Sequence, residues 1–347
     1  MIKINKSPVL TSQNYGINYF EIDEKLLNQK FDKFETYKIK NDQNVKVEAL
    51  NKKISNPMSN ELSIQSQNQA NFQKQIVFEN TSKDITNIKF DVSRPLVDVI
   101  DIVVKKDASA KLILEYSSNE NMYHNGVLNL TLEKDAELDI VILYNMKNSS
   151  NNFVSINSNI DNNSQLNIFI IDFGCQNSVQ RLENSLNGDY SVFSLNSIYF
   201  GSNTDNLGIN YLSNVFGKST QTYMNSICVL DGHAKKNFVG TIDFKQGSKK
   251  SVGDVSENCI MLSKTAKSLS TPILLCGEED VDGKHSSSLG KIDEDELFYM
   301  MTRGISKQDA IKLLIKAKLS KLLNNIFDEQ LREKIKERIE DKLNEHR

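Results

Sequence analysis

The sequence predicts a mainly β chain that ends in helices, on three observations. Segments from Ile76 onward alternate apolar and polar residues, as in the run from Ile88 to Val92, and this is the period of a β-strand. The turns between these segments recur at a nearly fixed interval. Near the C-terminus the alternation gives way to two marked helix starts. We therefore expect an N-terminal arm and linker over residues 1–75, a β-rich core over 76–291 and a C-terminal helical domain over 292–347.

The first 75 residues carry weaker signals than the rest of the chain. An apolar cluster at residues 15–22 precedes a predicted helix from Asp23 to Phe34. Residues 56–75, NPMSNELSIQSQNQANFQKQ, are rich in amides and serines and poor in large apolar side chains. This composition predicts a linker or an extended loop, and the whole region reads as a cap or arm rather than a domain.

The turns of the core mark a repeat. Asp107, Asp135 and Asn163 each precede a short apolar strand, and they follow one another at steps of 28 residues. Later turns at 187–189 and 231–233 drift from this interval but keep the strand–turn–strand unit. Units of this size without helices between them favour a solenoid, in which each coil buries its face by stacking on the next. On period alone, an antiparallel sandwich with turns roughly every 8–12 residues stays open as the alternative.

Two helix starts follow the core. Asp293 with Glu296 resembles a capping box, and Ser306 with Asp309 forms a second start. Apolar residues then make a wide surface on the second helix and a step-by-four stripe on a third, at Ala310, Ile311, Leu313, Leu314, Ile315, Ala317, Leu331, Ile335, Ile339 and Leu343. These helices either cap one end of the core or offer part of their apolar surface to a partner, and the sequence leaves both interpretations open.

Composition excludes several classes of function. A net charge of −3 gives no reason to expect a nucleic-acid or anionic-membrane surface. The four cysteines form no CxxC pair, no apolar run follows Met1, and no stretch of 18 apolar residues occurs, so we expect a reduced cytoplasmic protein. His124, His233, His285 and His346 have no ligand-like spacing to any cysteine, and neither a phosphate-binding GxxxxGK[ST] loop nor a GxSxG motif is present.

One stretch of the sequence resembles a known family. Residues 268–315, SLSTPILLCGEEDVDGKHSSSLGKIDEDELFYMMTRGISKQDAIKLLI, are similar to the C-terminal signature of the SufB/SufD family of iron–sulfur cluster assembly scaffolds. The matching elements occur in order, from Thr271-Pro272 through His285, Gly290-Lys291-Ile292 and Asp295 to Tyr299, to Arg303-Gly304-Ile305. A weaker resemblance extends back through residues 229–240, so that 76–345 are covered.

The resemblance implies a right-handed parallel β-helix and a SufD-like role. In that family the scaffolds pair, SufD with SufB, through the C-terminal ends of their β-helices, and each binds the ABC-type ATPase SufC through its C-terminal helices. This implies a SUF-complex scaffold rather than an enzyme, with no stably bound cofactor and an iron–sulfur cluster present only transiently at the complex interface. The residues implied for ATPase binding are Arg303, Gly304, Ile305, Leu313 and Leu314.

The same resemblance selects three candidates for cluster assembly. His285 stands where SufD-like proteins have an interface histidine, and an imidazole suits iron as a ligand. Relatives often carry a cysteine two places earlier, where this chain has Gly283. The sulfur-receiving cysteine of SufB falls near Glu257, and Cys259, two residues on, would point to the same face of a strand. The plainer interpretations are a solvated histidine in a serine-rich loop and a buried structural cysteine.

Two alternatives to a SufD-like scaffold are kept. Carbohydrate-active β-helix enzymes share the solenoid, but they are usually exported and rich in aromatic residues along one face, whereas this chain has no tryptophan. A SufB-like or homodimeric scaffold is the second. In either scaffold role, residues 271–290 are expected to present an edge strand for pairing with another chain.

Overall fold

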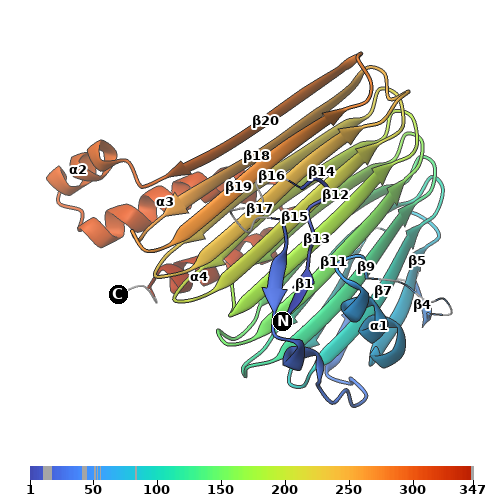
Figure 1. Cartoon of the computed structure of the whole chain (residues 1–347), viewed down its shortest axis with the longest axis horizontal. Helices are drawn as coiled ribbons and strands as arrows, with labels where there is room; N and C mark the ends of the chain where they lie inside the picture. Colours follow the sequence, from blue (N-terminus) through green and yellow to red (C-terminus); the bar gives the residue numbers. More distant parts are fainter. Residues whose placement is uncertain are drawn as a thin grey trace.

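The computed structural model describes residues 1–10, 18–40, 45–50, 52, 54, 56–82 and 84–344. It is a parallel β-solenoid of about eight turns with helices at its C-terminus, which confirms the predicted fold class. In Figure 1 the strands stack in sequence order, and β20 lies at the outer edge of the stack. No helix in the described ranges is long and apolar enough to cross a membrane.

Two nine-stranded sheets form the solenoid within the described residues. The even sheet contains β3 (Tyr37–Lys40), β6 (Ile85–Asp91), β8 (Ser109–Ser117), β10 (Glu137–Asn145), β12 (Gln165–Asp172), β14 (Val192–Gly201), β16 (Gln221–Leu230), β18 (Ser251–Met261) and β20 (Val281–Gly290). The odd sheet contains β4 (Val45–Ala49), β5 (Phe72–Phe78), β7 (Leu96–Val104), β9 (Tyr123–Leu132), β11 (Asn151–Ile160), β13 (Asn177–Leu186), β15 (Asn206–Val215), β17 (Lys235–Phe244) and β19 (Lys267–Cys276).

The register confirms the repeat read from the turns. Ser109 pairs with Glu137, and Glu137 pairs with Gln165, so neighbouring coils are offset by the 28 residues of the repeat. From β5 and β6 onward the paired strands run parallel, which excludes the antiparallel sandwich. The turn residues Asp107 and Asp135 have φ of 61° and Asn163 has φ of 56°. Aspartate and asparagine tolerate this left-handed conformation, and for this reason they mark these three coils. In later coils Tyr190, Ser219 and Lys250 adopt the same conformation, with φ of 57°, 53° and 60°.

The N-terminal region differs from its prediction. The expected linker at 56–75 contains α1 (Asn60–Gln69), whose first turn is capped when the Ser59 hydroxyl accepts from the Leu62 N–H at 3.2 Å. The linker prediction is wrong because the amides of this stretch bond buried groups of the odd sheet: Asn125 Nδ2 donates to Gln65 Oε1 at 2.8 Å. The predicted helix from Asp23 is only one 3-10 turn, η2 (Glu24–Leu27).

The arm reaches across the outer face of the odd sheet. Its strands β1 (Ile2–Ile4) and β2 (Phe20–Ile22) pair with each other, and the Asn5 amide donates to the main-chain oxygens of Gln180 and Gly208 at 3.2 and 3.1 Å. Of the predicted apolar cluster at 15–22, the first three residues lie outside the described ranges.

The C-terminal helices are α2 (Glu294–Thr302), α3 (Lys307–Leu323) and α4 (Glu329–Asn344), and both predicted starts are confirmed. Asp293 accepts from the Asp295 and Glu296 N–H groups, and Ser306 accepts from the Asp309 N–H. α3 and α4 do not cap the solenoid end. They bury their apolar side chains against the outer face of the even sheet, in one cluster that includes Val141, Phe169, Ile198, Leu319, Ile335 and Ile339.

Because α3 and α4 cover the even sheet, some of its strands are continuously apolar in sequence. Stretches such as Ile140 to Leu143 and Ile168 to Ile171 are continuously apolar, whereas a sheet with one wet face alternates. Here alternate residues of β10 and β12 point into the solenoid, and the intervening ones contact the helices. Both faces of these strands are therefore dry.

Candidate functional site

The C-terminal end of the solenoid is open. β19 and β20 are the last strands of their sheets and have a neighbouring strand on one side only (Figure 1). The N–H groups of Lys267 and Gly277 donate to the main-chain oxygens of Ala234, just before β17, and of Phe244 at the end of β17. The even-numbered residues between Lys267 and Gly277 therefore direct their N–H groups to the free edge. Pro272, which has no N–H, occupies one of these free positions. The expected edge strands within 271–290 are confirmed.

A buried polar group lies just inside this open end. Lys236 on β17 and Glu257 on β18 form an ion pair, and both side chains are excluded from solvent. Ser270 and Ser287 donate to Glu257 Oε2 at 2.7 and 3.2 Å, and Lys236 Nζ donates to Ser270 Oγ at 3.1 Å. We call these four residues the end cluster. It ties together the last two strands of each sheet.

His285 belongs to β20 and not to a loop, which corrects the loop part of the plainer interpretation, while the residue is exposed to solvent as that interpretation expected. It pairs in register with Val255, and Ser287 pairs with Glu257, so the His285 and Ser287 side chains leave the same face of the strand. The imidazole is exposed at the open end, on the side of the end cluster. Gly283 shares this face, while Ser286 points the opposite way.

Two cysteines lie next to the end cluster, with their side chains in the core of the solenoid. Cys259 is buried and pairs in register with Cys228 of β16. A hydrogen bond from Cys228 and the nearby Lys236 ammonium lower the pKa of the Cys259 thiol to about 7, although burial opposes this. Burial raises the pKa of Cys228 well above its usual range. Sequence reasoning singled out Cys259 and Glu257 but missed Lys236 and Cys228, which come from coils about 20 to 30 positions away.

Of the residues implied for ATPase binding, Arg303, Gly304 and Ile305 form the turn between α2 and α3, whereas Leu313 and Leu314 lie within α3. Gly304 has φ of 87°, its N–H bonds to Met301 O at 3.0 Å, and the Ile305 N–H bonds to Met300 O at 3.3 Å. This is a Schellman motif, which requires glycine at its left-handed position. Arg303 stacks over the Tyr299 ring at 5.2 Å. The Arg303-Gly304-Ile305 motif therefore sets how α2 turns into α3.

Several large apolar side chains of α2 and α3 are exposed. We call this set the α2 patch, and its members are Phe298, Tyr299, Met301 and Leu313, with Phe298 67% and Leu313 46% exposed. Leu314, by contrast, packs against the cluster between the helices and the even sheet. The apolar residues noted on α3 and α4 in the sequence are thus mostly buried within the described part of the chain, and Leu313 and Ala317 are the exposed ones among them.

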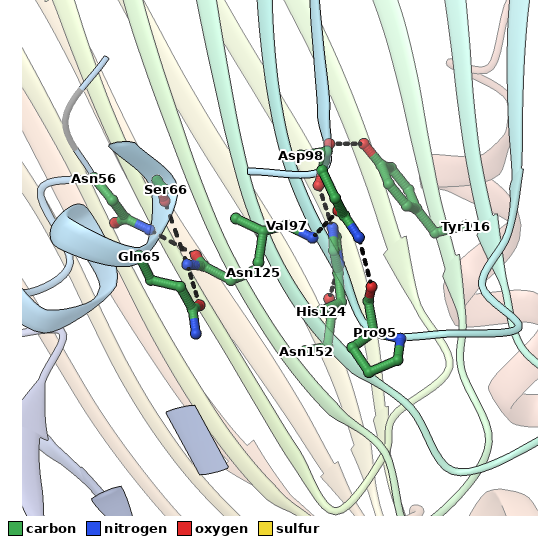
Figure 2. Close-up of polar contacts among 11 residues, drawn as sticks. Asn56, Gln65, Ser66, Pro95, Val97, Asp98, Tyr116, His124, Asn125 and Asn152 are labelled. Carbon is green, nitrogen blue, oxygen red and sulfur yellow. Dashed lines mark hydrogen bonds and ion pairs between the residues drawn. The ribbon is translucent and has the colours of Figure 1, made fainter. Parts of the chain in front are cut away.

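A second buried polar group, near the N-terminal end, escaped sequence reasoning. Figure 2 shows Asp98 between Tyr116 and His124: its Oδ2 accepts from the Tyr116 hydroxyl at 2.9 Å, and its Oδ1 lies 2.6 Å from His124 Nε2. His124 Nδ1 lies 2.7 Å from Asn152 Oδ1. The neighbouring Asn125 points to the opposite face and contacts α1. Because these groups are fully buried and bonded to one another, they stabilise the coils rather than offer a site to solvent.

A signal for this group did exist in the sequence. Asp98 interrupts an apolar strand, and His124 and Asn152 follow at about one coil length each. Among the described residues no group of three or more histidine, cysteine, aspartate or glutamate side chains is arranged to hold a metal ion.

Comparison with known families agrees with the open solenoid and its C-terminal signature. The family described as "SUF system FeS cluster assembly, SufBD core domain" matches residues 91–318, more than half of the chain. The chain belongs to the SufBD family. Membership confirms the resemblance read from residues 268–315 and extends it through most of the solenoid.

The individual relatives indicate that this chain is a SufD-like member of the SufBD family. The iron–sulfur cluster assembly protein SufD of Bacillus subtilis is 33% identical over 111 residues, which are 32% of this chain and 25% of the relative. SufD of Escherichia coli K12 is 33% identical over 95 residues, 27% of this chain and 22% of the relative. The SufBD family protein PH1385 of Pyrococcus horikoshii is 34% identical over 79 residues, 23% of this chain and 18% of the relative. Each match thus spans a quarter or less of the relative's own length.

Proposed function

We propose that this chain is a SufD-like scaffold subunit on which an iron–sulfur cluster is assembled at an interface between two solenoids. The observation that carries the proposal is the open end, where the edge strands β19 and β20 each have one free edge and carry Ser270 and Ser287 of the end cluster and the exposed His285. The second solenoid is a SufB-like subunit, or a second copy of this chain when no such subunit is present. Family membership favours this role over the carbohydrate-active alternative.

Pairing through the open edge can be tested with one proline. The N–H of Leu274 faces the free edge, whereas that of Leu275 faces β17. Leu274→Pro removes a donor that only a partner would use. Binding to a SufB-like subunit, and self-association of the isolated chain, should both fall, as measured by light scattering after size-exclusion chromatography.

Leu274→Ala is the matched control for this test. It shortens the side chain but keeps the N–H, so it should pair like the unaltered chain. Leu275→Pro is unsuitable, because it would break the ladder with β17 inside the solenoid. If Leu274→Pro pairs as well as Leu274→Ala, the interface lies elsewhere.

His285 is the group of this chain that we assign to the nascent cluster. Its imidazole is exposed, shares a face with Ser287, and can bind iron or accept a proton there. His285→Ala should leave folding and pairing intact, and iron and acid-labile sulfide per reconstituted complex should fall markedly. Lys284→Ala, on the opposite face, is the control. An intact complex with unchanged cluster content would leave the chain a purely architectural role.

We assign the ATPase-binding surface to the α2 patch. Its side chains are apolar, exposed and held by the Schellman turn, so they can be buried by a partner without refolding this chain. Phe298→Ser should reduce co-purification with a SufC-like ATPase, while Glu337→Ala on the outer side of α4 should not. Deleting residues 306–347 is a poor test, since it would strip α3 and α4 from the even sheet and expose its outer face. ATPase binding unaffected by Phe298→Ser would refute the assignment.

A further inference from the structure

The paired cysteines inside the open end have the geometry of a disulfide that has not formed. Cys228 and Cys259 occupy directly paired positions of two parallel strands, and both side chains point into the solenoid. Neighbouring strands lie about 4.8 Å apart. That separation falls within the Cα–Cα range of roughly 4.4–6.8 Å found in disulfides. Bridging these two residues therefore needs no large movement of the backbone.

The surroundings of the two thiols give them different roles. Cys259 receives a hydrogen bond from Cys228 and lies near the Lys236 ammonium, and both favour its thiolate. Both cysteines are buried, but burial raises the pKa of the Cys228 thiol well above its usual range, so Cys228 stays protonated. Cys259 is thus the nucleophile, and Cys228 is the thiol positioned to resolve its oxidised form.

Their place in the fold gives a small oxidant a short route. On the other side of Cys259 the register partner is Leu289 of β20, which is 59% exposed at the open edge. Only this one strand separates the Cys259 position from the free edge of the even sheet. Cys175, buried among the middle coils, has neither a paired cysteine in register nor an edge strand beside it within the described part of the chain.

We propose that Cys228 and Cys259 are an oxidation site, at which hydrogen peroxide converts the two thiols to a reversible disulfide. The Cys259 thiolate attacks the peroxide oxygen, the O–O bond breaks, and the leaving hydroxide takes up a proton as water. The Cys228 sulfur then attacks the Cys259 sulfenic acid, and the S–O bond breaks as a second water leaves with the Cys228 proton. Two thiols are oxidised to one disulfide, and one peroxide is reduced to two waters.

This site goes beyond the proposed scaffold role, because it needs neither a partner subunit nor a cluster. The disulfide would tie β16 to β18 and remove the thiolate beside Lys236, next to the end cluster that faces the interface. Oxidation would thereby alter the charge inside the open end without touching its exposed edge.

The test uses the full chain, reduced and then treated with stoichiometric hydrogen peroxide. Intact mass should fall by two hydrogen atoms, and peptide mapping should find Cys228 joined to Cys259, a product that dithiothreitol reverses. Because thiolate is the reactive form and the pKa of Cys259 is about 7, the rate should rise about tenfold from about pH 6 to about pH 8.

Cysteine variants separate this site from the other thiols. Cys228→Ser and Cys259→Ser should lose the product, whereas Cys175→Ser, buried but unpaired with another cysteine, and Cys276→Ser, exposed at the edge, should keep it. The wild-type peptide map decides the matter even if a variant folds poorly. Four thiols that remain free to alkylation after denaturation would overturn the proposal. So would a disulfide formed only between chains through Cys276, or a sulfinic acid on Cys259.

Discussion

Breaking the ion pair of the end cluster should loosen one end of the solenoid and leave the other intact. Glu257→Gln keeps the shape of the side chain and one acceptor oxygen, but it replaces the other oxygen by a donor NH2 and leaves the Lys236 ammonium buried without its counter-charge. Removing one partner of a buried ion pair costs about 3–5 kcal/mol. Because the glutamine oxygen can still accept from Ser270 and Ser287, we expect the loss of unfolding free energy to lie at the lower end of this range, about 3 kcal/mol.

The loss should be local, because each coil of a solenoid contacts only its neighbours. Hydrogen exchange followed by mass spectrometry should show faster exchange of amides in β17 to β20. Amides of β7 to β11 should exchange as in the unaltered protein. A free-energy change below about 1 kcal/mol, or faster exchange spread evenly over all coils, would refute the reasoning. In the control variant Lys236→Met/Glu257→Leu both charges are removed, and most of the stability should return.

Three further outcomes are expected. Ile335→Ala, in the fully buried stripe of α4, should lower the unfolding free energy by about 2–5 kcal/mol and release α4, seen as protease sensitivity. Gly304→Ala should cost about 1 kcal/mol, since alanine is strained at a φ of 87°, and should weaken ATPase binding by turning α2. Burial raises the pKa of Glu115, but the hydrogen bonds from Lys334 and Lys89 outweigh it, so the net pKa is lowered. The stability that the Glu115 carboxylate adds to the packing of α4 is present above the unfolded pKa of about 4.3 and is lost as pH falls through the lowered folded value. α4 should therefore be held less tightly in acid and be more sensitive to protease, and Glu115→Gln should reduce this pH dependence.

The features predicted correctly from the sequence are those set by local chemistry. The left-handed turns favour aspartate or asparagine, as at Asp107 and Asp135, and a helix start favours a capping side chain such as Ser306. Both can therefore be read from a few consecutive residues. The edge strands within 271–290 were expected because a scaffold built as a solenoid has an open end at its last coil. The solenoid itself was decided by the family signature, since period alone also allowed a sandwich.

The features that were missed depend on which coils lie side by side. Gln65 and Ser66 look like linker residues until Asn125, some 60 positions away, supplies their partner. The neighbours of Glu257 come from three other strands, and its buried partner Lys236 reads as an ordinary surface lysine in the sequence. Likewise, the sequence of an apolar helix stripe does not show whether the stripe packs on the sheet of its own chain or on another protein. Contacts of this kind need the register between coils, which strand alternation alone does not give.

The lengths of α3 and α4 match the length of the stack of coils that they cover. On α4, Lys334 bonds Glu115 of β8 at 2.7 Å, and Arg338, one helical turn later, bonds Asn145 of β10 at 3.1 Å. A helical turn advances about 5.4 Å and a strand step about 4.8 Å, so helix and stack advance almost together. A homologue with one more coil between β8 and the open end would need about one more turn in both α3 and α4 to keep α2 beside β20. The number of coils and the lengths of α3 and α4 should therefore change together among relatives, about three to four residues in each helix for every coil.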